Sequence, residues 1–568
     1  MNILGLKVFG HDTGAALISE TNSGINITAI SEERLNRRKH TSRFPILSID
    51  YCLKNNNMDL NDIDLIVFNE RRNHYNLDGF FDFKYVNEHR IYDSKIGKTF
   101  CWDESKVHII NHHDAHAASA YFSSPFEESA ILVVDSSGNQ GESQSLYYAS
   151  GNNMELIERS YNRGIGKLYD LVTSDILGFK HSGDAGKTMG LSAFGNIDIP
   201  KYNNFFVPQF HGIDIDVSKY IEEDEINLCL KTNIVSAKKE QLMDLPYVKI
   251  AYEIQKTTEI CMKHLVNYAW QVTQCKNLCI AGGVGLNCVA NDKLRQATKF
   301  ENIFIQPASD DSGIPLGAAL YGFNKIMNNN KRFRMNSASL GKKYSTSNLI
   351  ELLNKYSIPY FECDIDYLVD CLSSSKIVGF FYEGGEYGPR ALGNRSIICD
   401  PRDPNMKNKL NSNVKHREKF RPFAPIVLEN LVEEYFDINI PSQYMLYAPT
   451  VKAKTIKYAP SIVHKDNTAR VQTINKNNGF IYDLLKKFYN KTGVPILLNT
   501  SFNDNEPIVE TPLDALICLL STNIDGIYFP PIYVPKIDNQ EILMKLVNQR
   551  TKNIIIQKEE ALNTFCIN

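Results

Sequence analysis

Two stretches in the first third of the chain share one pattern: an apolar run, a turn that contains Asp and Gly, and a second apolar run. Residues 1–21 have the turn His-Asp-Thr-Gly at 11–14, and residues 129–150 have Asp-Ser-Ser-Gly at 135–138. Short apolar runs bounded by turn residues are typical of buried strands. Such turns also occur in hairpins that bind nothing, so the pattern alone does not define a site. The repeat predicts a fold built from two related halves.

Short apolar runs alternate with longer amphipathic runs along most of the chain, which predicts an α/β architecture. A helix is expected over 251–275, followed by a strand and then a second helix from about Asn291. Further along the chain, strands are expected within 376–384, 422–429 and 493–501.

The stretch 328–348, NNNKRFRMNSASLGKKYSTSN, is polar, basic and poor in aliphatic residues. This composition is typical of a linker at a domain boundary. We therefore expect a first domain over 1–335, a second α/β domain over 345–537 and a C-terminal tail over 538–568.

The composition argues against some classes of function. The chain has 568 residues, of which 43% are hydrophobic and 22% charged, enough for several packed cores. A net charge of -3 disfavours a nucleic-acid partner. No apolar run approaches the ~18 residues of a membrane span, and the N-terminus lacks the features of a secretory signal. We expect a cytoplasmic protein with no membrane partner, whose 12 scattered cysteines are mostly core residues.

Histidines and carboxylates suggest a metal site in the first domain. His112 and His116 are four residues apart in NHHDAHAASAYF, so on a helix both imidazoles project from the same face. Asp135 ends a predicted strand, and Asp310 and Asp311 lie in a predicted strand-to-helix loop. Two histidines and carboxylates with open coordination positions suit iron(II), or manganese or zinc. A helix surface with chance histidines is the alternative.

The stretch CIAGGVGLNC at 279–288 runs from a predicted strand through paired glycines toward a helix. Paired glycines at such a turn are typical of a site for a phosphate-bearing ligand, because backbone amides can approach the ligand closely. Gly282, Gly283 and Asn287 are therefore candidate nucleotide-binding residues. A simple tight turn would have the same sequence.

The order of these motifs resembles that of the TsaD-type threonylcarbamoyl transferases, which are metal-bearing members of the actin-like ATPase fold. The motifs that carry the resemblance are HxxxH at 112–116, DSSG at 135–138, GGVGLN at 282–287 and DSG at 311–313.

Three longer motifs in the second domain narrow the match to one family. They resemble the C-terminal part of the NodU/nebramycin-synthetase family of O-carbamoyltransferases: YEGGEYGPRALGNRSIICDPR at 382–402, VKHREKFRPFAP at 414–425 and LLNTSFNDNEPIVETPLDAL at 497–516. The resemblance covers nearly the whole chain. It implies an α/β fold in which an N-terminal actin-like ATPase (TsaD-like) domain with duplicated halves precedes a C-terminal YrdC-like domain.

The resemblance also implies an activity, the ATP-dependent transfer of a carbamoyl group from carbamoyl phosphate to a hydroxyl. The YrdC-like domain would form carbamoyl-AMP, and the TsaD-like domain would pass the carbamoyl group to a small-molecule or sugar acceptor. The implied cofactors are Fe(II) or another divalent transition metal, with ATP and Mg as co-substrate. The implied metal ligands are His112, His116, Asp135 and Asp311, and a homodimer is expected.

Residue roles follow from the same resemblance and from the chemistry of the side chains. His11 and Asp12 are candidates for the base that takes the proton of the acceptor hydroxyl, although Asp12 could equally cap the hairpin. Lys415 and Arg421 are candidates for adenylate formation, because lysine and arginine stabilise transferring phosphoryl groups. The candidate nucleotide- and phosphate-binding residues are Ser137, Gly138, Gly282, Gly283, Asn287, Arg390, Arg395, Lys415, Arg417, Arg421, Arg470, Ser501 and Asn503.

Three other functions share part of this pattern. A tRNA threonylcarbamoyl transferase-like enzyme would have the same fold and metal but would act on nucleic acid. A nucleotide-sensing module of the actin-like fold would need neither the histidine pair nor a carbamoyl phosphate site. A sugar kinase would yield ADP, whereas the expected activity yields AMP and pyrophosphate.

Overall fold

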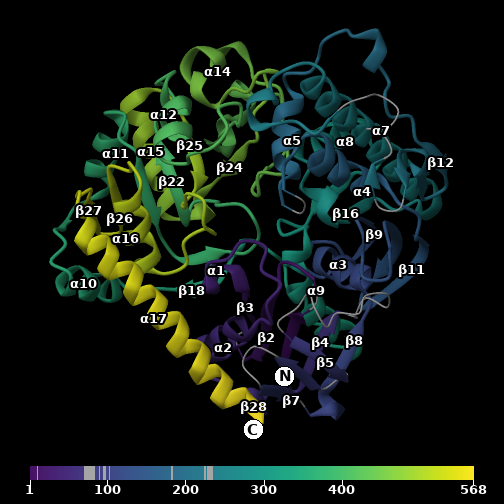
Figure 1. Cartoon of the computed structure of the whole chain (residues 1–568), viewed down its shortest axis with the longest axis horizontal. Coiled ribbons are helices and arrows are strands. Elements are labelled where there is room, and N and C mark those ends of the chain that lie inside the picture. Colours follow the sequence, from purple (N-terminus) through teal and green to yellow (C-terminus); the bar gives the residue numbers. More distant parts are fainter. Residues whose placement is uncertain are drawn as a thin grey trace. The chain divides into compact units, whose positions relative to one another are not determined.

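The computed structural model of the chain describes all residues except 9, 23, 70–82, 88–89, 94–97, 102, 181–182, 223–224, 227–234 and 568. By its internal contacts the chain divides into two compact units. Unit 1 comprises Met1–Glu33, His40–Ser337 and Lys558–Asn568, and unit 2 comprises Arg34–Lys39 and Ala338–Gln557. In Figure 1, unit 1 is mainly purple to teal and unit 2 mainly green to yellow.

Unit 1 contains two five-stranded sheets with the same strand order in the part of the chain that the structure describes. The first has the order β3-β2-β1-β4-β8 and the second the order β11-β10-β9-β16-β17. In each sheet the first three strands are antiparallel and the last two join in parallel. The predicted duplication is therefore present in the strand order.

The strands of these two sheets are β1 (Asn2–Lys7), β2 (Gly14–Thr21), β3 (Gly24–Ser31), β4 (Leu65–Asn69), β8 (Val107–Ile110), β9 (Glu128–Val134), β10 (Gln144–Ser150), β11 (Asn153–Ser160), β16 (Asn277–Ala281) and β17 (Asn302–Ile305). Smaller sheets are formed by β5 (Phe83–Asn87), β6 (Arg90–Asp93), β7 (Lys98–Cys101) and β28 (Cys566–Ile567), by β12 (Gln209–His211) and β13 (Asp214–Asp216), and by β14 (Ile221–Glu222) and β15 (Glu225–Ile226).

The helices of unit 1 include the predicted long helix, which is α7 (Tyr247–Thr273) and ends where Gln274 adopts the left-handed conformation. The second predicted helix, α8, begins at Cys288, three residues before the predicted start at Asn291. The helices are α2 (Ile46–Asn55), α3 (His112–Tyr121), α4 (Ile165–Leu171), α5 (Ala185–Ser192), α7, α8 (Cys288–Ala297) and α9 (Ile314–Leu320), and the short α1 (Glu32–Asn36) crosses the boundary between the units.

Strand β1 and helix α9 are packed so closely that only glycine fits at position 5. A Cβ atom built on Gly5 would lie 2.1 Å from the carbonyl oxygen of Pro315 and 2.4 Å from the amide nitrogen of Ala319. Real Cβ atoms do not come this close to backbone atoms, so a larger residue would push the strand and the helix apart. Because side chains two apart in a strand share one face, Lys7 projects toward α9 on the same side as Gly5.

We expect Gly5→Ala to destabilise unit 1 by about 1–3 kcal/mol, the usual cost of overpacking a core. The midpoint and slope of denaturant unfolding measure the change. Gly186→Ala is the matched control, because Gly186 lies in helix α5 and, apart from its chain neighbours and the backbone of its own helix, no atom lies within 4 Å of the added Cβ. Alanine there should be neutral or stabilising, by about 0.5–1 kcal/mol. Equal effects of the two substitutions would contradict the close packing of β1 on α9.

Unit 2 contains one eight-stranded mixed sheet in the order β19-β27-β26-β20-β22-β25-β23-β24, counted over the described residues. The three predicted strands are present as β20, β23 and β25. Its strands are β19 (Phe361–Glu362), β20 (Val378–Phe381), β22 (Arg395–Cys399), β23 (Ala424–Leu428), β24 (Gln472–Ile474), β25 (Ile496–Ser501), β26 (Gly526–Phe529) and β27 (Ile532–Pro535).

Amphipathic helices cover the sheet of unit 2. The apolar faces of α11 and α15 form one buried cluster with the sheet, and this cluster includes Leu372, Phe380, Leu484 and Phe488. The helices are α10 (Thr346–Lys355), α11 (Ile365–Ser373), α12 (Met406–Asn413), α13 (Val432–Tyr435), α14 (Ala453–Tyr458), α15 (Phe480–Thr492) and α16 (Pro512–Ser521).

The predicted linker 328–348 is partly regular structure. Its second half contains β18 (Ser339–Lys343), which pairs with β21 (Gly384–Glu386), and the start of α10. Ser345 and Asn348 form a capping box at that helix start, so polar residues that suggested a loop serve to begin a helix.

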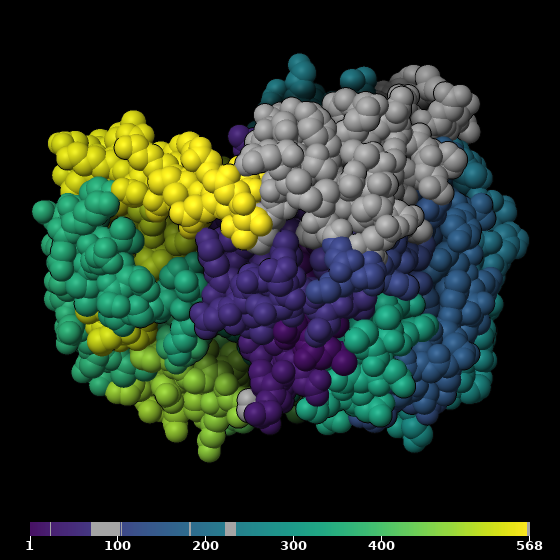
Figure 2. Space-filling model, turned by 90° about the horizontal axis from the view of Figure 1, so that it is seen from below, coloured from purple at the N-terminus to yellow at the C-terminus, as the bar shows by residue number. Residues whose placement is uncertain are grey.

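The predicted tail 538–568 is mostly one helix, α17 (Gln540–Phe565), whose residues up to Gln557 belong to unit 2 and the rest to unit 1. Its yellow atoms form a band on the surface in Figure 2, and Met544, Ile555 and Ile556 are each more than half exposed. Among the described residues, no helix combines the length and apolarity needed to cross a membrane.

Candidate metal centre and cation cluster

The four predicted metal ligands of unit 1 converge. His112, His116, Asp135 and Asp311 each offer one donor atom, and these atoms lie within 4.8 Å of one another. The Nε2 atoms of the two histidines lie 3.3 and 3.5 Å from Oδ2 of Asp135, and 3.4 and 3.5 Å from Oδ1 of Asp311. Asp310 is not part of this group, because its side chain accepts hydrogen bonds from Ser312.

Local structure explains why these side chains meet. Helix α3 starts at His112, with Asn111 as its N-cap, so the four-residue spacing places both imidazoles on one face. Asp135 follows the last residue of β9, and Asp311 opens the short helix that leads into α9. The sequence spacing thus fixes the histidine pair, while the fold brings the aspartates to it.

Each aspartate presents one oxygen to the histidines and has its other oxygen held by the chain. Oδ1 of Asp135 accepts hydrogen bonds from the backbone amides of Ser136 at 2.8 Å and Gly283 at 3.3 Å. Oδ2 of Asp311 accepts a hydrogen bond from the ammonium of Lys7, which is buried. Sequence analysis missed Lys7, although a lysine ending an apolar strand was a signal.

The donor set fits a divalent metal ion. Ligands roughly 2.1 Å from one ion stand roughly 3.0–3.4 Å apart, close to the four distances measured here. Both ring nitrogens of His116 and Nδ1 of His112 are buried without a hydrogen-bond partner among the described residues. Buried polar atoms normally have partners, so the unsatisfied Nε2 of His116, 3.5 Å from one oxygen of each aspartate, indicates a place for a cation.

The pKa values of these groups show how strongly they interact with one another. Burial lowers the pKa of His116, but the carboxylates of Asp135 and Asp311 outweigh burial and raise it to about 9. Burial raises the pKa of Asp135 and Asp311, but the histidines, and for Asp311 also Lys7, hold both pKa values well below the ordinary range. Both carboxylates are therefore ionised at neutral pH, as metal ligands must be.

The glycine-rich turn serves the same centre. Gly282 has a φ of +87°, and a Cβ there would lie 2.3 Å from the carbonyl oxygen of Val134, so only glycine allows this approach to β9. The turn delivers the amide of Gly283 to Asp135. Asn287 is the N-cap of α8 and exchanges hydrogen bonds with Gln255. In this structure the motif orients a carboxylate and starts a helix; its role toward a nucleotide stays a prediction.

The hairpin that contains Ser137 and Gly138 is tied to helix α3 through Glu142. The amide of Gly138 donates to the Glu142 carbonyl at 2.7 Å, and the Glu142 carboxylate accepts hydrogen bonds from the amide of Gln140 and from the side chain of Asn111. Glu142 is fully buried, and sequence analysis missed it. The hairpin is thereby fixed next to the histidine pair.

Asp12 connects two histidines at the tip of the first hairpin. Its carboxylate lies 2.8 Å from Nδ1 of His11 and 2.9 Å from Nδ1 of His40. The hydrogen bond to Asp12 raises the pKa of His40 to about 9. The side chains of His11 and His40 are 46% and 40% exposed, so both can meet a substrate. His40 was missed because it is 28 residues from Asp12.

Asp12, Glu33 and His40 also form a second group with donor atoms within 4.8 Å of one another. Here the polar atoms have partners: Asp12 bonds the His40 imidazole, and Glu33 accepts the His40 backbone amide at 2.9 Å. These contacts explain the cluster without a metal ion.

The predicted phosphate-binding residues of unit 2 gather at one end of its sheet. Strand β25 ends at Ser501, where it pairs with the start of β22; β23 begins near Arg421; and β24 begins just after Arg470. Because β22, β23 and β24 all start at the end where β25 finishes, residues up to 113 positions apart in the sequence lie at one end of the sheet.

Lys415 lies at the centre of this group of residues. Its buried ammonium, with three N–H groups, lies within hydrogen-bonding distance of four oxygens: the carbonyl and hydroxyl of Ser501 at 2.6 and 3.2 Å, and the carbonyl and side-chain oxygens of Asn503 at 2.7 and 2.6 Å. Burial, followed by the charge of Arg417, holds the pKa of Lys415 well below its ordinary value. The structure thus brings Lys415 into contact with Ser501 and Asn503, three residues that were predicted separately as binding residues.

Like charges surround Lys415. Burial and then the neighbouring Arg421 and Arg470 lower the pKa of Arg417, against the opposite effect of Glu418. The guanidinium of Arg417 also donates to Asn411 at 2.8 Å and lies 4.4 Å from the Phe423 ring. An excess of positive charge in one partly buried place favours the binding of a polyanion.

Two further arginines that were predicted to bind phosphate or nucleotide differ in how deeply they are buried. Arg390 is partly exposed on the loop before β22. Arg395 is fully buried, donates to the carbonyls of Tyr382 and Glu383, and lies 3.6 Å from the centre of the Phe381 ring. Nε and Nη2 of its buried guanidinium have no hydrogen-bond partner among the described residues, and its role toward a nucleotide stays a prediction. Sequence motifs do not show which arginine of a Gly- and Pro-rich loop points inward.

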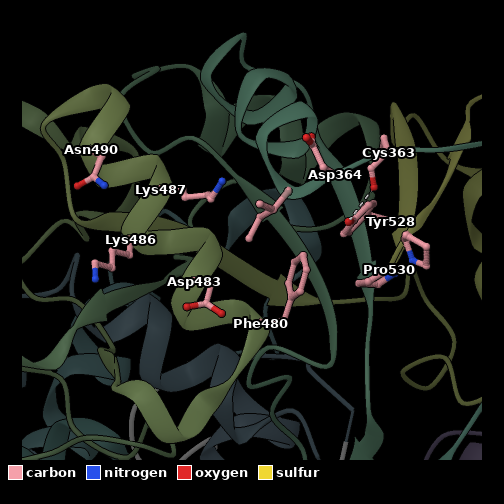
Figure 3. A pocket seen from close by; sticks show the side chains of 11 residues that line it. Cys363, Asp364, Phe480, Asp483, Lys486, Lys487, Asn490, Tyr528 and Pro530 are labelled. Carbon is pink, nitrogen blue, oxygen red and sulfur yellow. Dashed lines mark hydrogen bonds between the residues drawn. The ribbon is translucent and has the colours of Figure 1, made fainter.

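A surface pocket of about 710 Å³ lies elsewhere on unit 2 (Figure 3). It is lined by Phe480 and Tyr528 and by polar side chains of α15 that include Asp483 and Lys486. None of the predicted site residues lines it, and Lys487 at its edge pairs with Asp366 at 2.7 Å. We assign it no part in the function.

Comparison with known families agrees with the two-part organisation. Residues 2–101 and 87–320 match the family model described as carbamoyltransferase N-terminus, and residues 369–536 match the one described as carbamoyltransferase C-terminus. The chain therefore belongs to the carbamoyltransferase family and is an enzyme of that class.

The curated relatives identify the branch predicted from the motifs. Nodulation protein NolNO of Sinorhizobium fredii is 33% identical, over 92% of this chain and 78% of its own length. Nodulation protein U of Rhizobium tropici is 28% identical, over 89% and 91%. An uncharacterized protein of Synechocystis sp. is 32% identical, over 92% and 95%. The predicted relation to NodU-type carbamoyltransferases is confirmed.

Solved structures add little. The crystal structure of full-length HypF in its phosphate- and nucleotide-bound form aligns with a TM-score of 0.30 at 13% identity, over 58% of this chain and 56% of that chain. A value this low supports no argument about the fold, which depends here on the strand order itself.

Proposed function

We propose that the protein is an ATP-dependent O-carbamoyltransferase that makes carbamoyl-AMP from carbamoyl phosphate and ATP and transfers the carbamoyl group to a hydroxyl of a small-molecule or sugar acceptor. Unit 1 would be the actin-like, TsaD-like transfer domain and unit 2 the YrdC-like activation domain. The observation that carries the proposal is the convergence of His112, His116, Asp135 and Asp311 in a buried, unsatisfied cluster.

Unit 2 would perform the activation step. Water hydrolyses carbamoyl phosphate to carbamate and phosphate. The carbamate then attacks the α-phosphorus of ATP, and pyrophosphate leaves. Lys415, Arg417, Arg421 and Arg470 would hold the phosphates, because these four basic side chains lie close enough together to lower the pKa of Lys415 and of Arg417, after burial as the larger cause. Ser501 and Asn503 would fix the lysine in place.

Unit 1 would perform the transfer step. A divalent transition metal held by His112, His116, Asp135 and Asp311 would act as a Lewis acid toward the carbamoyl group. His11, oriented by Asp12, would take the proton of the acceptor hydroxyl as that oxygen attacks the carbamoyl carbon and AMP leaves. His40, whose pKa of about 9 keeps it protonated at neutral pH, would instead hold the Asp12 carboxylate in place. The ionised Asp12 stabilises the imidazolium that forms.

Product analysis tests the proposal. The full chain, loaded with a divalent metal, is incubated with Mg-ATP, carbamoyl phosphate and a panel of hydroxylated acceptors. We expect AMP and pyrophosphate, together with an acceptor that gains the mass of one carbamoyl group. Formation of ADP would instead indicate a kinase. Tight, salt-sensitive retention on tRNA would favour a threonylcarbamoyl transferase-like function.

A further inference from the structure

The two aspartates of the metal centre are held by different donors. The oxygen of Asp135 that does not face the histidines meets two neutral backbone amides. The corresponding oxygen of Asp311 meets the ammonium of Lys7, whose side chain is only 1% exposed. A buried ammonium is costly unless it is paired, so the contact between Lys7 and Asp311 is a specific feature of this site.

The packing of the fold forces this contact. Gly5 brings β1 against α9, and Lys7 lies two residues further on the same face of the strand. Asp311 lies three residues before the start of α9. The close approach at Gly5 therefore places the ammonium of Lys7 next to the carboxylate of Asp311.

We propose that Lys7 is a positioning residue that holds Asp311 as a one-oxygen ligand and so keeps one coordination position of the metal open. The inference rests on the metal centre of the proposed function. Carboxylates bind metals through one or both oxygens. With Oδ2 of Asp311 engaged by Lys7, only Oδ1 faces the two histidines. The four protein ligands then use four positions, which leaves room for a substrate oxygen on an ion that takes five or six ligands.

Binding of small ligands to a cobalt-loaded protein tests this role. The full chain is freed of metal, titrated with Co²⁺ and followed by visible absorption, and then azide or imidazole is added. The variants are Lys7→Met and the control Lys249→Met. Lys249 is also a buried lysine of unit 1, but it pairs with Glu253 at 2.8 Å within α7. The control shows what loss of any buried lysine does to the protein.

We expect the wild type and Lys249→Met to bind one Co²⁺ and to change spectrum with either probe. Lys7→Met should retain Co²⁺ but need about tenfold more of both azide and imidazole, the size of effect seen when an outer partner of a metal ligand is lost. Imidazole is neutral, so weaker binding of imidazole to Lys7→Met would report the loss of an open coordination position and not only the loss of the positive charge that attracts azide. If imidazole binds Lys7→Met as tightly as the wild type, or if Lys7→Met loses the metal altogether, the inference is overturned.

A measurement on the wild type covers the case in which Lys7→Met does not fold. In a crystal structure of the cobalt-loaded wild type, Oδ2 of Asp311 should stay on Lys7 and lie more than ~3 Å from the ion; both oxygens within ~2.5 Å would overturn the inference. Failure of the proposed function is distinguishable from failure of this role. If the wild type binds no Co²⁺, the proposed metal centre is wrong. If the wild type binds Co²⁺ and Lys7→Met binds both probes as tightly as the wild type does, only the proposed role of Lys7 is wrong.

Discussion

His116→Ala is expected to abolish carbamoyl transfer while leaving carbamoyl-AMP formation within about twofold of the wild type. The imidazole is fully buried between Asp135 and Asp311, so its loss removes one of the four proposed metal ligands and changes no residue of unit 2. A metal ion contributes several kcal/mol to such a reaction, which corresponds to roughly 10³-fold or more in rate. Acceptor carbamoylation followed by mass spectrometry measures the second step, and exchange of labelled pyrophosphate into ATP measures the first.

His113→Ala is the matched control for this prediction. His113 is the neighbouring buried histidine of α3, but its Nδ1 lies 2.7 Å from the Ser145 hydroxyl and it is outside the four-donor group. It should keep the metal and keep transfer within about tenfold of the wild type, since only packing and one hydrogen bond are lost. If His116→Ala blocked pyrophosphate exchange and left transfer intact, the assigned division of labour would be wrong.

Lys415→Met should stop adenylate formation, with a loss of roughly 10²–10³-fold in pyrophosphate exchange, the usual cost of removing one donor from a preorganised electrostatic site. Methionine keeps the length and apolar stem of lysine but removes the charge. The variant should still bind one divalent metal, because the four proposed metal ligands belong to unit 1 and Lys415 to unit 2. Metal content by elemental analysis and pyrophosphate exchange together measure the outcome.

Lys536→Met is the control for a lysine that stabilises the fold by donating hydrogen bonds to backbone carbonyls. Lys536 also lies in unit 2 and donates to the carbonyls of Leu519, Leu520 and Thr522 at 2.8, 3.0 and 2.7 Å. Its loss should lower stability and leave exchange nearly unchanged. Equal loss of exchange in both variants would show that Lys415 acts on stability and not on the reaction.

Features that depend on neighbours in the sequence could be predicted. The four-residue spacing of His112 and His116 predicted their common face, because helix geometry alone sets it. The two hairpins predicted the duplicated sheets, because apolar runs and turns are local signals. The predicted linker was partly wrong because Ser and Asn residues are favoured both in loops and at helix starts, and the local pattern does not separate the two.

What the sequence alone determined about this protein is its family, its alternation of strands and helices, and the identity of the four donor residues. Only the tertiary structure showed that Lys7 meets Asp311, 304 residues away, that His40 shares Asp12 with His11, and that Arg395 points into the core. The physical reason is that periodicity in the sequence shows which side chains lie on one face of a helix or strand. Which residues contact that face depends on how separate helices and strands pack together.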